Sequence, residues 1–182
     1  MKISNIKRLT LSALCVALCV VLPMAFHVIP NAGSVMLPMH IPVLLCGLVC
    51  GWPYGLICGL LGPLLSSFTG MPPLPVLPGM MVECGVYGLV TGLMMRFVRT
   101  GKPTGDLYIS MITAMILGRV LSGFAKAWIF TPGIGAFAWV TTSLVMGIPG
   151  IVIQLVVMPV LVMTLTRAKL IPCRYSQKIA CI

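Results

Sequence analysis

The sequence predicts an all-α membrane protein: a compact bundle of six transmembrane helices, some of them short or broken. Of its 182 residues, 59% are hydrophobic and only 8% are charged, whereas soluble domains carry about 25% charged residues. So few charged groups cannot cover a globular surface, which excludes a soluble enzyme. The length suits roughly six spans of about 20 residues. We therefore predict one transmembrane domain over 1–182, with a core at about 8–166 and a basic cytoplasmic tail at about 167–182.

The first expected span runs from Leu9 to Phe26 and follows a basic N-terminus. A signal peptide has the same charge pattern, but no small-residue cleavage site follows, so we predict a retained helix. The next apolar stretch, 37–68, is too long for one upright helix and too short for two full spans. We predict two short helices there, separated by a tight turn at 51–55 (Gly-Trp-Pro-Tyr-Gly).

The segment 69–79 contains four prolines, which exclude a helix interior. Because this segment is apolar, we expect it to fold over the bundle as a lid. The remaining spans are expected at 80–98, about 107–130 and about 138–165, the last one interrupted at 147–150 (Gly-Ile-Pro-Gly). Glycines at four-residue spacing favour close contacts between helices inside the bundle; they are Gly47, Gly51, Gly55 and Gly59, then Gly88 and Gly92.

The basic residues alternate between the two sides of these spans. Ten of the twelve Lys and Arg residues fall in the N-terminal segment, the loop after the fourth span and the C-terminal tail. The three opposite loops, near 27–36, 69–79 and 131–137, contain none. Because basic residues collect on the cytoplasmic side, we predict a multi-pass protein of the cell membrane with both termini in the cytoplasm. The net charge of +10 thus reports topology and does not indicate a nucleic-acid partner.

Enzymatic, cofactor and metal signatures are absent from the sequence. It has no HExxH, GxSxG or Walker motif, and two acidic residues and two histidines offer little material for acid–base catalysis. The eight cysteines form no CxxC pair and no zinc-type spacing with histidine, so we expect buried thiols and no disulfide framework. We therefore predict a protein that is not an enzyme and that holds no cofactor or metal.

Arg119 and Lys126 are the two basic residues inside an expected span, where they share one helix face. A charge at membrane depth costs several kcal/mol unless it is paired or hydrated. Glu83, near the outer end of the fourth span, is the acid available to them. Lys126 is expected at a similar depth and Arg119 about 10 Å deeper, at about 1.5 Å per residue. We therefore expect Glu83 to neutralise one of the two cations.

This pattern predicts an outward-facing pocket with one uncompensated positive charge, suited to a substrate that bears a carboxylate. A purely structural alternative is a buried Glu83–Lys126 pair with Arg119 capping backbone carbonyls at a helix break. Three further residues are expected near the pocket: Tyr87 one turn from Glu83, His40 at the outer end of the second helix, and Asn31 in the first outer loop.

Several segments resemble the substrate-binding (S) subunits of energy-coupling factor (ECF) vitamin transporters. The first helix contains Ala13 and Ala17 in the pattern Ala-Leu-Cys-Val-Ala, which is similar to the AxxxA signature of that family. Four further segments are similar to one branch of it: 37–45 (LPMHIPVLL), 62–67 (GPLLSS), 69–73 (TGMPP) and 80–88 (MMVECGVYG). The likeness covers about 8–166.

The resemblance implies a membrane subunit that captures a micronutrient on the outer side. It also implies that the Ala13–Ala17 face docks onto a transmembrane coupling subunit driven by two cytoplasmic ATPases, and that the subunit topples in the membrane to release its substrate. Pantothenate and folate carry carboxylates and suit Arg119 and Lys126, whereas a wide apolar pocket also fits cobalamin or a queuine-like base.

Two other classes of function remain open from the residues. One is a membrane scaffold of similar fold, such as a cell-shape protein, in which the buried charges are structural. The other is a self-sufficient carrier or channel that works as a homo-oligomer.

Overall fold

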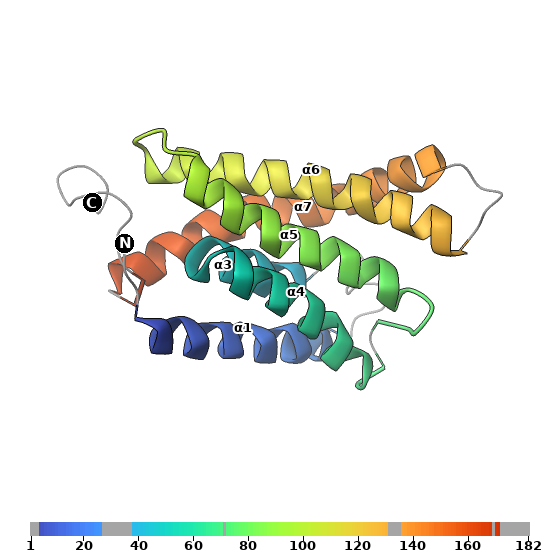
Figure 1. Cartoon of the computed structure of the whole chain (residues 1–182), viewed down its shortest axis with the longest axis horizontal. Coiled ribbons are helices and arrows are strands. Elements are labelled where there is room, and N and C mark those ends of the chain that lie inside the picture. The colour runs from blue at the N-terminus through green and yellow to red at the C-terminus, as the bar shows by residue number, and fades with distance from the viewer. Residues whose placement is uncertain (1–3, 27–37, 71, 131–135, 169, 172–182) are drawn as a thin grey trace.

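The computed structural model describes residues 4–26, 38–70, 72–130, 136–168 and 170–171, and these residues form α-helices without any strand. The helices are α1 (Asn5–Phe26), α3 (His40–Cys50), α4 (Trp52–Ser67), α5 (Leu77–Phe97), α6 (Pro103–Phe130) and α7 (Ala136–Arg167). The all-α prediction is confirmed. In Figure 1 the helices run roughly along one axis, and α1 begins at the end where α7 finishes.

Four of the described helices contain a stretch that is long and apolar enough to cross a bilayer: α1, α5, α6 and the second half of α7. The other two are short, with 11 residues in α3 and 16 in α4. At about 1.5 Å per residue neither helix matches the roughly 30 Å of a hydrocarbon core. The predicted pair of short helices is thus confirmed.

The break between α3 and α4 lies at Gly51. Its φ of 96° is in the left-handed region, which glycine enters without a steric penalty. The predicted five-residue turn is wrong, because α4 resumes helical geometry at Trp52. Pro53 stands in the first turn of α4, where its missing N–H leaves no intrahelical hydrogen bond unmade.

Two other predicted breaks also differ from the structure. The expected loop 69–79 is shorter, because α5 already begins at Leu77 with Pro78 in its first turn. The expected interruption at 147–150 is absent, and α7 continues through Pro149. Membrane helices tolerate proline, since neighbouring helices and local adjustments satisfy the freed backbone groups.

Helix α5 lies inside the bundle and packs against α3, α4 and α6, while α1 packs on α3 and α4 and α7 packs mainly on α6 (Figure 1). The α4–α5 contact depends on glycine. A Cβ built on Gly88 would collide with the Gly55 backbone, and one built on Gly59 would collide with the carbonyl of Cys84. The predicted close contacts are confirmed for the glycines at four-residue spacing except Gly51, where a Cβ would meet no neighbouring helix and which lies instead at the break between α3 and α4.

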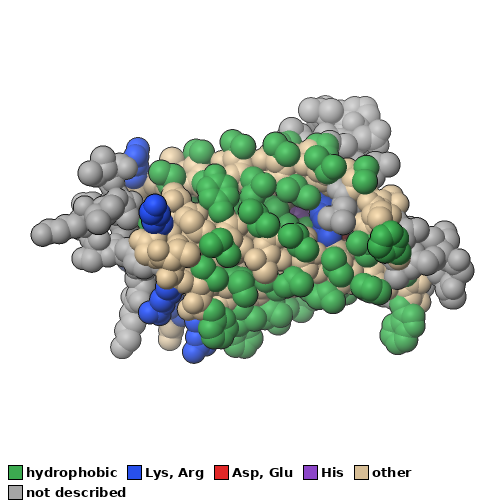
Figure 2. All heavy atoms as spheres, turned by 90° about the horizontal axis from the view of Figure 1, so that it is seen from above, with side chains coloured by type: hydrophobic (Ala, Val, Ile, Leu, Met, Phe, Trp, Pro, Cys, Tyr) green, Lys and Arg blue, Asp and Glu red, His purple; other side chains and the backbone are tan. Residues whose placement is uncertain are grey.

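The outer surface of the bundle is largely apolar, and basic side chains gather at one end, while others lie beside a histidine nearer the opposite end (Figure 2). Large hydrophobic side chains such as Leu61, Ile116 and Val156 point outward. Six cysteines are buried as free thiols between the helices; they are Cys15, Cys19, Cys46, Cys50, Cys58 and Cys84. An apolar exterior with a basic end is the surface expected of a protein that spans a membrane.

Candidate functional site

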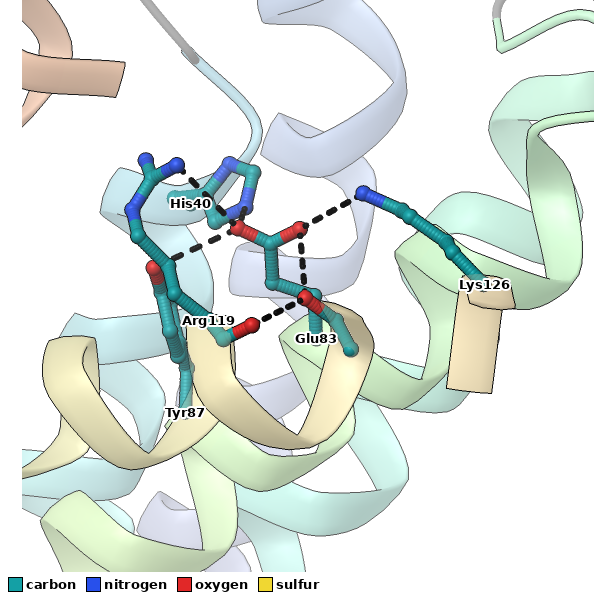
Figure 3. A network of polar contacts seen from close by, with 6 residues as sticks. His40, Glu83, Tyr87, Arg119 and Lys126 are labelled. Carbon is teal, nitrogen blue, oxygen red and sulfur yellow. Dashed lines mark hydrogen bonds and ion pairs between the residues drawn. The ribbon is translucent and has the colours of Figure 1, made fainter. Parts of the chain in front are cut away.

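A single buried carboxylate, that of Glu83 on α5, lies at the centre of the candidate site (Figure 3). Its side chain is 6% exposed. Side chains from three helices converge on it: His40 from α3, Tyr87 from α5 itself, and a row of residues from α6. The contact of α5 with α4 and α6 on either side places this carboxylate inside the bundle.

The two cations of α6 both reach Glu83. Nη1 of Arg119 lies 3.9 Å from Oε1, and Nζ of Lys126 lies 3.5 Å from Oε2. Figure 3 shows the two side chains approaching the carboxylate from opposite sides. The expectation that Glu83 reaches only one of them is therefore wrong, because the long side chains cover the roughly 10 Å between the two Cα atoms along α6. The single charge of Glu83 can still balance only one of the two cations.

Two neutral hydroxyl groups complete the contacts with the carboxylate. The hydroxyl of Tyr87 donates to Oε1 over 3.3 Å, and that of Ser122 lies 3.4 Å from Oε2. Tyr87 follows Glu83 by one turn on the same face of α5, as its spacing predicts. Its ring lies against Gly118 of α6, where a Cβ would collide with it. The absent side chain of Gly118 thus makes room for the tyrosine.

His40 begins α3 and is 1% exposed. Its Nε2 lies 3.6 Å from Oε1 of Glu83, and its ring packs edge-on against Tyr87 with the ring centres 5.1 Å apart. Neither ring nitrogen has a hydrogen-bond partner among the described residues. A buried polar group normally finds such a partner, so His40 brings unused hydrogen-bonding capacity to the site.

The charges of the cluster do not cancel. Glu83 contributes one negative charge against the two positive charges of Arg119 and Lys126, a formal sum of +1 that does not count His40. The only other acid in the sequence is Asp106, whose carboxylate accepts hydrogen bonds from the backbone N–H and hydroxyl of Thr100 near the start of α6. The contacts around Glu83 are also longer than the 2.7–2.9 Å typical of short charge-assisted hydrogen bonds.

This arrangement is suited to binding an anion. The hydrogen-bond donors around the Glu83 carboxylate form no short hydrogen bonds with it. They can therefore also bind the acceptor atoms of a second anionic group. The low dielectric of a buried site strengthens such electrostatic contacts. No group of three or more His, Cys, Asp or Glu side chains arranged to hold a metal ion occurs in the part of the chain that the structure describes.

The remaining predicted residues lie elsewhere. Asn31 falls outside the described residues, so its place near the pocket stays a prediction. Ala13 and Ala17 are exposed on the outward face of α1, whereas Cys15 and Cys19 of the same helix are buried. Ser122 is a site residue that the sequence does not predict. It lies between the two cations on α6, and its contact with Glu83 depends on the packing of α6 against α5.

Replacing Glu83 with alanine should destabilise the fold, because it leaves Arg119 and Lys126 buried without their carboxylate. Breaking one side of a buried ion pair costs about 3–5 kcal/mol, and we expect a loss of that size in the free energy of unfolding. The thermal midpoint of the purified protein in detergent measures it. Lys126→Met in the Glu83→Ala background should recover part of the loss. An unchanged midpoint in Glu83→Ala would show that the cations do not depend on this carboxylate.

A comparison with curated protein sequences finds no match. The family model for the substrate-specific component of ECF transporters matches residues 7–162, which include every described residue of the cluster. That match covers most of the chain and agrees with a helical bundle whose apolar helices suit a membrane. The chain therefore belongs to the family of ECF transporter substrate-specific components.

Proposed function

We propose that this protein captures a micronutrient bearing one carboxylate on the outer side of the cell membrane and delivers it inward with an ATP-driven ECF module. The observation that supports the substrate class is the buried cluster with a net charge of +1, formed by Glu83, Arg119 and Lys126. A positive charge at membrane depth costs several kcal/mol unless it is compensated. A substrate carboxylate supplies that compensation.

The position of the cluster along the bundle supports capture from outside. Glu83 lies six residues, or about 9 Å along the axis, from the start of α5 at Leu77. The opposite ends of the helices hold Arg96 and Arg167 in their last turns. Because basic ends face the cytoplasm, the cluster is at the outer end, and both termini are cytoplasmic. Figure 2 shows basic and histidine side chains together at a hollow far from the basic end.

Pantothenate and folate are both acidic vitamins. Pantothenate bears one carboxylate and matches the formal charge of the cluster, whereas folate bears two and would exceed it by one. Cobalamin or a queuine-like base would fill an apolar pocket but would leave the cation charge uncompensated. The cluster therefore favours the acidic vitamins over these two. His40, with its unused ring nitrogens, is placed to hydrogen-bond a second polar group of the same substrate.

Docking onto the coupling subunit is proposed for the outward face of α1. Ala13 and Ala17 are exposed there and stand one turn apart. Small side chains at this spacing let two helix backbones approach closely. The face lies away from Glu83, because α1 packs on α3 and α4 whereas the cluster lies between α3, α5 and α6. Docking and substrate capture thus use separate surfaces of the subunit.

Mass spectrometry of small molecules retained by the purified protein tests the proposal directly. A retained acidic vitamin supports it. A retained neutral compound would preserve capture but contradict the substrate class. Protein that retains nothing and transports nothing with an ECF module would favour a scaffold, and transport by the chain alone in vesicles would favour a self-sufficient carrier.

Arg119→Ala should weaken binding of the retained compound by about 2–5 kcal/mol, the usual penalty for removing one side of a desolvated charged contact. Stability should suffer less than in Glu83→Ala, because Glu83 keeps Lys126 at 3.5 Å. Isothermal titration and the thermal midpoint in detergent measure the two effects. Arg96→Ala, at the basic end, is the control and should leave affinity unchanged. Unaltered affinity in a destabilised Arg119→Ala protein would assign the arginine a structural role.

Replacing Ala13 or Ala17 with leucine should block transport, because the larger side chain separates two helix backbones that must pack closely. Substrate binding to the isolated subunit should survive. Uptake by cells that contain the module and binding by the purified subunit are the two measurements. Ala25→Leu, at an exposed alanine near the other end of α1, should leave both intact. Loss of binding in the isolated Ala13→Leu subunit would show instead that this alanine packs inside the bundle.

The proposed orientation predicts that position 102, at the start of α6, is cytoplasmic. In a background without native cysteines, Lys102→Cys should resist a membrane-impermeant thiol reagent added to intact cells and react once the cells are opened. The segment between α4 and α5 provides the matched position, and Leu74→Cys there should react from outside. Leu74 is 75% exposed in the structure, so its accessibility does not depend on local unfolding. Labelling of position 102 from outside would reverse the topology.

A further inference from the structure

The guanidinium group of Arg119 lies directly against the backbone of Gly147 on α7. A Cβ built on Gly147 would collide with Cζ, Nη1 and Nη2 of Arg119, and these three atoms are equally near to it. The guanidinium therefore turns its flat side toward the glycine. Gly147 is buried, and the missing side chain creates the space that the cation occupies.

Backbone geometry offers no other reason for glycine at this position. Gly147 lies within the continuous helix α7, where glycine costs about 1 kcal/mol relative to alanine. It does not belong to the glycines with positive φ, which are Gly51, Gly70 and Gly101. It also differs from Gly123 of α6, whose Cβ would press on the side chain and backbone of Val140 on α7. Gly123 allows the two helices to approach, whereas Gly147 makes room for a side chain.

Lys126 shows the same relation to a second glycine. A Cβ built on Gly79, at the start of α5, would lie 2.6 Å from Cε and 2.8 Å from Cγ of Lys126. The side chain of each cation thus packs against a glycine of a neighbouring helix. Arg119 packs against Gly147 of α7, and Lys126 packs against Gly79 of α5. The two cations lie on opposite sides of the Glu83 carboxylate (Figure 3), and each is next to one of these glycines.

We infer that Gly147 is a positioning residue for the anion site. It determines where the Arg119 guanidinium lies beside Glu83. Helix α7 thus contributes to the site through its backbone and not through a side chain. The inference goes beyond the proposed function, on which it depends only for the statement that the cluster binds substrate. A methyl group at position 147 would push the guanidinium away from α7. The atoms that must yield are the end of a flexible side chain, so the helices can stay in place.

The test is a pair of substitutions made singly and together, Gly147→Ala and Arg119→Ala, in the full-length protein in detergent. In the wild-type background Gly147→Ala should lower the thermal midpoint by about 3 °C, the size of shift expected for a modest loss of stability at this chain length. In the Arg119→Ala background the three atoms nearest to that methyl group are removed, and alanine favours the helix. There the same substitution should leave the midpoint unchanged or raise it.

A second readout follows the guanidinium itself. Phenylglyoxal modifies arginine side chains, and mass spectrometry of peptides gives the rate at each position, with Arg96 and Arg99 as internal references. Displacement from Gly147 should raise the modification rate of Arg119 at least threefold relative to these references. Gly123→Ala is the matched control, because it crowds the same α6–α7 contact without touching Arg119. It should lower the thermal midpoint in both backgrounds and leave the relative rate at Arg119 unchanged.

Two results would overturn the inference. One is an effect of Gly147→Ala on the thermal midpoint that is equal in the two backgrounds. The other is a modification rate at Arg119 that does not change, or that rises equally in Gly123→Ala. Neither readout requires a substrate, so the test stands even where the retained-compound experiment contradicts the proposed function.

Discussion

The ion cluster around Glu83 is the constraint on which the packing of α3, α5 and α6 depends. One carboxylate serves two cations in a region where each unpaired charge costs several kcal/mol. That requirement fixes the relative positions of α5 and α6, because Arg119, Ser122 and Lys126 must all face Glu83. It also explains the small residues around the cluster, since Gly79, Gly118 and Gly147 leave space for the stem of Lys126, the ring of Tyr87 and the guanidinium of Arg119. Around the cluster, glycine thus leaves room for polar side chains.

Elsewhere in the bundle, glycine allows two helix backbones to come into contact. Gly55, Gly59 and Gly88 bring α4 and α5 into direct backbone contact, which is the close approach that small residues permit between membrane helices. Between lipid and protein there is little hydrophobic driving force to hold such helices together, so van der Waals contact must provide it. These two roles of glycine are linked. The α4–α5 contact sets the position of α5 along the bundle axis, and this position determines whether Glu83 contacts the cations of α6.

The sequence predicted the fold well where hydrophobicity decides it and less well where proline and glycine do. Apolar lengths located the spans and the short pair α3–α4. The predicted breaks at 51–55 and 147–150 differ from the structure. The first needs only a single glycine, and the second does not occur because α7 remains helical through Pro149. For the site, helix periodicity placed Arg119 and Lys126 on one face. Depth counted along the helix could not show that both reach Glu83, because flexible side chains cover the difference. The role of Gly147 could not be predicted from the sequence, because it depends on which side chain of α6 lies against this position of α7.

The net charge of the cluster links substrate capture to movement of the subunit in the membrane. Under the proposed function, the empty site has a formal charge of +1, and burying it deeper in the bilayer costs energy. A bound monoanion brings the sum to zero and removes most of that cost, since the penalty at membrane depth falls on uncompensated charge. A neutral ligand would leave the penalty unchanged. Under the proposed function, the loaded site therefore moves deeper into the bilayer at a lower cost than the empty one, and the charge balance of the site favours inward movement of the bound substrate. In this proposal the exposed alanine face of α1 has only to bind the coupling subunit, because the charges of Glu83, Arg119 and Lys126 would by themselves favour movement of a loaded site.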